Sequence, residues 1–221
     1  MNKNLIVVAL VLTAVSMNAH AQKAGGMSLE AGITLLSLQV GSGDLSAPAF
    51  PNTKADVSDA TGLTGAFTYM ATDNIAINVP LGLGFKHDIT GAARAQGFGK
   101  LATVRALPIT VLGQYRFGQA NDTLRPYVGG GLAFVKFYKE TGSAALTALT
   151  NPGGAPVTLS VESKLAPVIQ LGAIFNINQQ WFANAHYAKT FVTADTKFST
   201  GQTQSIKLNP NAFSIAVGYK F

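Results

Sequence analysis

The chain ends in the stretch AFSIAVGYKF, residues 212–221, and this stretch decides the predicted fold. Its large side chains recur at every second position, so that one face carries Phe213, Ile215, Val217, Tyr219 and Phe221. Alternation with a period of two is the pattern of a β-strand. A face that stays large and apolar up to an aromatic last residue is typical of a strand that meets lipid. The stretch therefore predicts the closing strand of a membrane β-barrel.

The same alternation recurs along the chain and predicts seven further strands. Its clearest example is residues 75–86, where every odd position is Ile, Val, Leu or Phe. The eight predicted strands cover residues 29–40, 63–69, 75–86, 106–117, 124–138, 165–177, 181–187 and 212–221. An even number suits a single-chain bacterial barrel. The sequence thus predicts an all-β fold, an eight-stranded antiparallel transmembrane β-barrel.

The connections between these strands alternate in length. Residues 72–74, 118–123 and 178–180 form short turns, whereas residues 41–60, 88–100, 139–160 and 197–204 form longer loops. Outer-membrane barrels have short periplasmic turns and longer extracellular loops, so both termini are expected in the periplasm.

Aromatic residues gather at the ends of the predicted strands, as amphipathic rings do at membrane interfaces. The periplasmic girdle is expected to contain Tyr69, Tyr115, Phe117, Phe175, Trp181, Tyr219 and Phe221. The outer girdle is expected to contain Phe85, Phe134, Phe191 and Phe213.

The first 21 residues have the features of a secretory signal peptide. A short basic start is followed by an apolar run from Leu5 to Val15 and by Ala19-His20-Ala21, a small-x-small cleavage pattern. The run is too short for a bilayer-spanning helix, which needs about 20 residues. We therefore expect a cleaved signal peptide over residues 1–21 and a barrel domain over residues 22–221, located in the outer membrane.

Composition agrees with this location. Charged residues make up only 12% of the chain, against about 25% in a typical soluble domain. The net charge of +6 is spread without a run of Lys or Arg, which indicates contact with outer-membrane lipid and lipopolysaccharide and argues against nucleic acid. The chain has no cysteine and therefore no disulfide or cysteine metal site of its own.

Closure of the first strand onto the last is expected because an open edge in lipid leaves backbone N–H and C=O groups unpaired. Glu30 and Lys220 would then both face inward near the same end. We expect them to form a charge pair inside the lumen.

Several motifs resemble the OmpW family, which includes AlkL-like eight-stranded barrels. They are the segments 68–75 (TYMATDNI), 102–118, 125–129 (RPYVG) and 218–221 (GYKF). The resemblance runs in order across essentially all of the chain after residue 21. Residues 41–60 and 139–160 carry no matching motif.

The resemblance implies an outer-membrane channel for the passive uptake of small hydrophobic molecules. The ligand would bind in an apolar lumen and leave laterally through the barrel wall, where the prolines matching the family's positions are Pro80 and Pro108. The carry-over of this lateral gate has a physical basis, because proline has no N–H for the strand ladder and two prolines on neighbouring strands are expected to weaken one seam. The terminal strand is expected to be recognised by the barrel assembly machinery.

The predicted lumen is mostly uncharged in its middle, which suits an apolar ligand. Its ligand-binding residues are predicted to be Thr34, Leu36, Leu38, Ala66, Thr68, Met70, Leu112, Val168 and Ile174. No cofactor or energy source is implied.

Enzyme and metal chemistry find little support in the residues. His186 is predicted to face inward with Asn184 and Ala188 along its strand, and no Ser–His pair is evident. His87 and Asp88, at the start of an outer loop, are two possible ligands where zinc wants three or four. The alternatives left open are a surface structural or receptor barrel, bound by phage or colicin or serving a stress response without transport, and a lipid-modifying enzyme.

Overall fold

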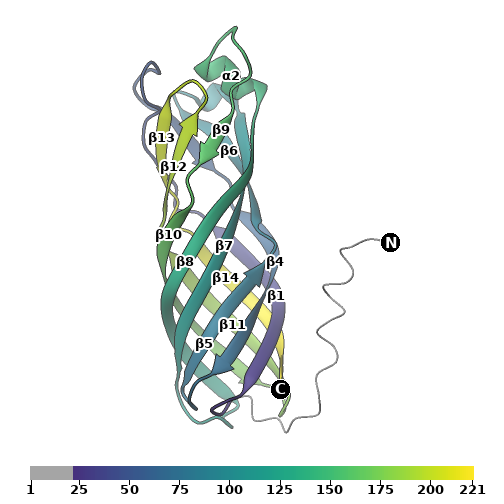
Figure 1. The fold of residues 1–221 in the computed structure, drawn as a ribbon. Coiled ribbons are helices and arrows are strands. Elements are labelled where there is room, and N and C mark those ends of the chain that lie inside the picture. Colours follow the sequence, from purple (N-terminus) through teal and green to yellow (C-terminus); the bar gives the residue numbers. More distant parts are fainter. Residues whose placement is uncertain (1–21) are drawn as a thin grey trace, which may run out of the picture.

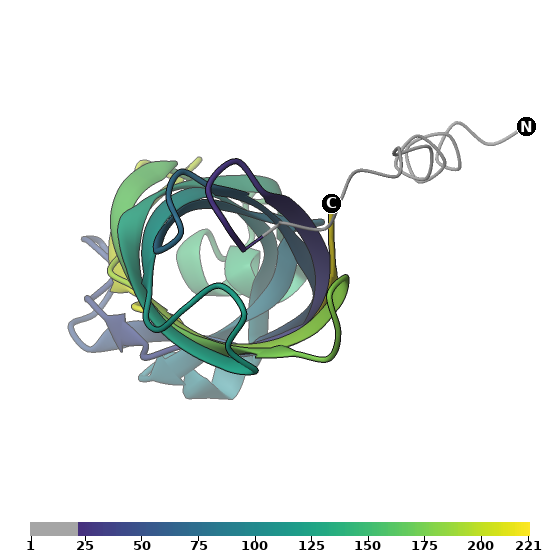
Figure 2. The ribbon, with the colours of Figure 1, turned by 90° about the horizontal axis from the view of Figure 1, so that it is seen from below.

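The computed structural model describes residues 22–221; the predicted signal peptide lies outside the described residues. Eight antiparallel strands close into a tilted barrel (Figure 1, Figure 2). They are β1 (Met27–Ser37), β4 (Ala60–Met70), β5 (Ile75–Gly82), β7 (Lys100–Arg116), β8 (Leu124–Gly142), β10 (Lys164–Asn176), β11 (Trp181–Thr190) and β14 (Asn211–Lys220). The predicted fold class is confirmed.

The first and last barrel strands pair with each other and close the wall. Their ladder runs from Ser28 opposite Lys220 to Ser37 opposite Asn211. The hydrogen bonds of this ladder pair backbone N–H and C=O groups that an open sheet would leave unpaired in lipid. The C-terminus, the start of the described residues and the short turns lie at one end of the barrel, here named the terminal end, and helix α2 lies at the other, the far end (Figure 1).

Outward-facing positions keep the apolar pattern that the sequence predicts. Ile33, Leu63 and Ile215 are 47%, 71% and 68% exposed, whereas the intervening Thr34 and Ser214 are buried. At the terminal end the aromatic rings pack edge to face, with the centroids of Trp181 and Tyr219 5.1 Å apart. The apolar outer surface and the aromatic ring around it are those of a barrel that faces lipid.

The far end carries more regular structure than the sequence predicts. In and beside the expected loops lie β2 (Gly41–Ser42), β3 (Thr53–Val57), β6 (Phe85–Ala93), η1 (Gln96–Phe98), α2 (Ala144–Thr150), β9 (Leu159–Val161), β12 (Thr193–Phe198) and β13 (Thr203–Lys207). β2, β13, β12 and β9 form a four-stranded sheet, and β3 pairs with β6. These strands are short, with five residues in β3 and β13, so their alternation gives little signal.

The strand predicted over residues 75–86 is two strands, not one. β5 ends at Gly82 and β6 begins at Phe85, with Gly84 between them at a φ of +80°. This left-handed conformation suits glycine. It reverses the facing of the residues that follow, so that Phe85 is buried in the lumen. The prediction that Phe85 belongs to the outer girdle is therefore wrong. Phe134, Phe191 and Phe213 do lie exposed.

No helix in residues 22–221 is long and apolar enough to cross a bilayer.

Candidate functional site

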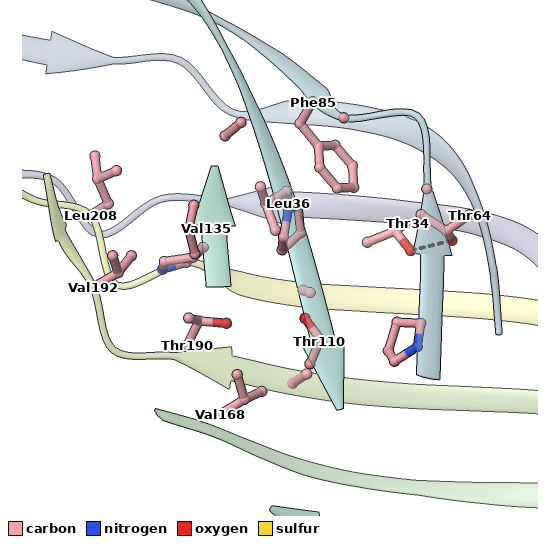
Figure 3. A pocket seen from close by; sticks show the side chains of 18 of the residues that line it. Thr34, Leu36, Thr64, Phe85, Thr110, Val135, Val168, Thr190, Val192 and Leu208 are labelled. Carbon is pink, nitrogen blue, oxygen red and sulfur yellow. Dashed lines mark hydrogen bonds between the residues drawn. The ribbon is translucent and has the colours of Figure 1, made fainter. Parts of the chain in front are cut away.

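A cavity of about 180 Å³ occupies the interior of the barrel toward the far end (Figure 3). Aliphatic and aromatic side chains supply most of its wall; those in Figure 3 include Leu36, Phe85, Val135, Val168, Val192 and Leu208. Threonine hydroxyls in the wall are partly bonded to one another, as between Thr34 and Thr64 at 2.7 Å. The wall is therefore suited to apolar molecules.

The structure brings six of the nine predicted lumen residues into the cavity wall: Thr34, Leu36, Leu38, Ala66, Leu112 and Val168. Thr68, Met70 and Ile174 are buried in the lumen but do not line the cavity. Met70 and Ile174 are almost fully buried, and Ile174 packs with Tyr127 and Phe182. These three belong to the filled part of the barrel below the cavity.

Polar side chains fill the lumen between the cavity and the terminal end. Arg116 donates to Gln114 at 3.1 Å, and Gln114 donates to Gln170 at 2.8 Å. Across the lumen, Tyr127 donates to Asn184 at 3.1 Å. These buried side chains fill the cross-section of the lumen, so they close the terminal end of the barrel, although the Nε of Arg116 has no partner among the described residues.

Arg125 ties the start of the described chain into this closure. Its guanidinium is fully buried and donates to the carbonyl oxygen and the side chain of Gln22, and to the carbonyl oxygen of Asp73 at 2.7 Å. Gln22 in turn donates to Asn176 at 2.7 Å. Gln22, five residues before β1, therefore lies inside the terminal mouth of the barrel.

The predicted charge pair between Glu30 and Lys220 does not form. Both side chains face the lumen, but Glu30 accepts two hydrogen bonds from Asn184, at 3.1 and 3.0 Å. Lys220 instead donates to the carbonyl oxygen of Asn178 at 3.4 Å. The reason is register: Lys220 is opposite Ser28, so Glu30 is displaced by two residues along the closing ladder.

The barrel wall is interrupted between β5 and β7. Their ladder stops at the pair Asn78–Leu112, and pairing along β7 resumes with β6 at Phe85–Ala106. Between these points residues 79–84 have no ladder partner on β7. Pro80 and Pro108 both lie in this interval, here named the seam, and neither has an N–H to donate.

The cavity reaches the seam. Pro80, Leu81, Gly82 and Pro108 line the cavity, although Leu81 is also 51% exposed on the outer surface. The residues predicted as a lateral gate therefore lie side by side where the cavity meets the outer face of the wall.

Comparison with known proteins agrees with this geometry. The family model described as the OmpW family matches residues 23–221. The chain belongs to the OmpW family. It is 33% identical to outer membrane protein W of Escherichia coli strain K12, over 99% of this chain and all of that protein. It is 24% identical to a dibenzothiophene metabolism operon protein of Pseudomonas aeruginosa, over 77% of this chain and 76% of that protein.

A solved structure supports the fold of this OmpW-family protein. The outer membrane protein OprG from Pseudomonas aeruginosa superposes with a TM-score of 0.82, over 91% of this chain and 98% of that one, at 23% identity. Together with the E. coli relative, this fold makes the chain an outer-membrane barrel. The family is one of outer-membrane proteins.

Sequence reasoning missed the upper wall of the cavity in this OmpW-family barrel. Val57, Ile89, Val161, Ala194 and Ile206 line it from strands of the far end. Their alternation was the available signal, but it extends over only three to nine residues per strand.

His87 was expected in a loop and lies instead in β6, buried, with its Nδ1 donating to the carbonyl oxygen of Ser58 at 2.8 Å. Burial lowers the pKa of His87, partly offset by the Ser58 carbonyl, Asp59 and Asp88. The neutral ring is therefore the form that suits its place in the cavity wall.

His186 faces the cavity, as predicted. Its Nδ1 is buried and has no partner among the described residues. Its ladder neighbours are Gly172 and Ser214, and Ser214 bonds to Thr34 at 2.7 Å, so no nucleophile is held against the ring. Within residues 22–221 no group of three or more His, Cys, Asp or Glu side chains is placed to hold a metal.

Proposed function

We propose that this protein is a channel for the passive uptake of small hydrophobic molecules across the outer membrane. The observation that carries the proposal is the combination of an apolar cavity that reaches a break in the wall with a terminal end closed by polar side chains. A ligand that enters from the far end finds no straight path along the axis. The seam is then its way out, into the lipid.

This route assigns an orientation. Both termini lie in the periplasm and the far end, with α2, faces outside, so the ligand enters from the medium. The name of the Pseudomonas aeruginosa relative, a dibenzothiophene metabolism operon protein, supports a hydrophobic substrate class, because dibenzothiophene is an apolar aromatic compound. We also propose that lipopolysaccharide contacts Lys86, Arg105 and Lys136, three outward-facing cations on neighbouring strands.

The lateral route is tested by restoring the ladder at the seam. In the variant Pro80→Val/Pro108→Val both strands regain an N–H, so β5 and β7 are expected to pair further and narrow the exit. The initial rate of uptake of a hydrophobic compound by cells or proteoliposomes should fall severalfold. Pro126→Val is the matched control, because Pro126 lies in a wall ladder away from the seam, opposite Ala173. Unchanged uptake in the double variant, with the barrel folded, would contradict lateral exit.

A further inference from the structure

The cavity is not uniformly apolar, because one side of it is polar in a defined way. Glu30, Asn78 and Gln170 line it where it borders the filled, terminal half of the lumen, and His186 also lines it. These four side chains are here named the polar end of the cavity. Aliphatic side chains line most of the rest of the interior, with scattered hydroxyl groups and the buried ring of His87; the aliphatic ones include Leu36, Val135, Val168, Val192 and Leu208.

Three members of the polar end are held in place from below. Asn184 donates to both oxygens of Glu30, Gln114 donates to Gln170, and Asn78 donates to Thr68 at 2.8 Å. Asn184, Gln114 and Thr68 do not line the cavity. Each supporting bond therefore fixes one face of a side chain and leaves another face toward the cavity.

Beyond these supporting bonds, the polar end offers the cavity both hydrogen-bond donors and hydrogen-bond acceptors. Gln170 accepts through Oε1, and its Nε2 has no partner among the described residues, so it is a donor. Each Glu30 oxygen has a further lone pair beyond the bond from Asn184 and is an acceptor. The ring of His186 lines the cavity, and neither of its nitrogens has a hydrogen-bond partner among the described residues. A buried polar group without a partner costs about 1–3 kcal/mol, so a ligand that satisfies these groups is favoured over one that does not.

We propose that the cavity selects hydrophobic molecules that carry one hydroxyl group, with the hydroxyl seated against Glu30, Gln170 and His186 and the hydrocarbon part along the aliphatic wall. This inference rests on the proposed function. A hydroxyl both donates and accepts, which matches the mixed capacity of the polar end. A carboxylate head would bring a second acceptor-only group against Glu30, where like charges repel, and so is disfavoured.

The test uses three probes of equal chain length: octane, 1-octanol and octanoate. Each is titrated into the protein in phosphatidylcholine nanodiscs, and the methyl resonances of Leu36, Val135 and Val168 report occupancy. Empty nanodiscs give the correction for partitioning into lipid. We expect 1-octanol to act at a concentration about fivefold to tenfold below octane, as one net hydrogen bond implies, and octanoate to bind more weakly than 1-octanol.

Variants separate the roles of the polar end. Glu30→Gln keeps an oxygen for Asn184 and removes the charge, so octanoate should gain about fivefold or more. His186→Phe keeps a ring and should reduce the preference for 1-octanol over octane. Asp56→Asn is the matched control: Asp56 is an exposed carboxylate on β3 outside the cavity and should change neither preference.

The outcomes are distinguishable. If octane and 1-octanol bind equally well to the wild-type protein, or octanoate binds as well as 1-octanol, the head-group selection is wrong while the hydrophobic channel stands. If none of the three probes shifts the lining methyls, the cavity is not a ligand site, and the proposed function fails together with the inference. Loss of binding of all three probes in Glu30→Gln alone, with the barrel folded, would also count against selection by charge.

Discussion

The phenol oxygen of Tyr138 donates a hydrogen bond to the carbonyl oxygen of Leu83, 3.1 Å away. Tyr138 lies on β8 and Leu83 lies in the turn between β5 and β6, so the bond crosses the outer face of β7. This turn forms one edge of the seam. Gly84, beside it, leaves room for the phenol, because a Cβ there would lie 2.5 Å from the Tyr138 oxygen.

Removing this bond should loosen the edge of the seam. In Tyr138→Phe the turn loses one hydrogen bond worth about 1 kcal/mol, so amide exchange at Gly84 and Phe85 should quicken by about fivefold. Uptake of a hydrophobic compound should rise with it. Tyr115→Phe is the control, because the Tyr115 hydroxyl lies in the outward aromatic ring and has no bond within residues 22–221. An unchanged exchange rate at Gly84 would show that Tyr138 does not restrain the turn.

The volume of the cavity should limit the size of the ligand. Val168 faces the cavity and Ile169, next to it on β10, faces outward at 52% exposure. Val168→Phe fills part of the cavity and should weaken binding of octane or 1-octanol about tenfold, because the added ring overlaps the ligand. Ile169→Phe places the same side chain in lipid and should leave binding unchanged. Equal binding by the two variants would mean that the ligand lies elsewhere.

The barrel strands and the position of the seam could be predicted from the sequence, whereas the hydrogen-bond partners of Glu30 and Lys220 could not. Alternation in the strands that face lipid is long and regular, as in residues 212–221, so it predicts strand number and facing. Pro80 and Pro108 lack backbone N–H groups, so they predict weak strand pairing between β5 and β7. The partners of Glu30 depend on register and on side chains from β11, which a pattern along one strand does not contain.

Phe85 marks a second limit of sequence reasoning. It continues the odd-position run from Ile75, yet it points inward because the chain turns at Gly84 with a positive φ. A glycine in the sequence permits a positive φ but does not predict one, since Gly82 nearby has no positive φ. The upper cavity wall was missed for a related reason: its strands are too short for their period to stand out from loop sequence.

Arg125 should stabilise the closed terminal end. Arg125→Met keeps the apolar stem but leaves the carbonyl oxygens of Gln22 and Asp73 without their buried donor. Loss of buried hydrogen bonds to a charged group should lower the free energy of unfolding by about 2–3 kcal/mol, measured by urea unfolding in lipid bilayers. Lys23→Met, at the exposed neighbour of Gln22, is the control. If both variants unfold alike, the Arg125 bonds do not support the barrel.

His87 should make the far end sensitive to pH. Burial lowers the pKa of His87 below its usual value of about 6.5, against the opposing effects of Ser58, Asp59 and Asp88. Between the lowered pKa and about 6.5 the unfolded chain binds more protons than the folded one, so stability rises with pH across this window and is lost as the pH falls. The change amounts to about 1.4 kcal/mol for each unit by which the pKa is lowered.

The pH effect is measured locally, by amide exchange at Val57 and Ile89 between pH 7.5 and pH 5, corrected for the intrinsic rates. Wild-type protection should fall as the pH is lowered, because burial in the apolar wall disfavours the charged imidazole and so destabilises the folded segment. His87→Gln keeps an N–H donor but does not titrate, so its protection should change little over the same range. Parallel pH profiles in the two proteins would assign the sensitivity to another group.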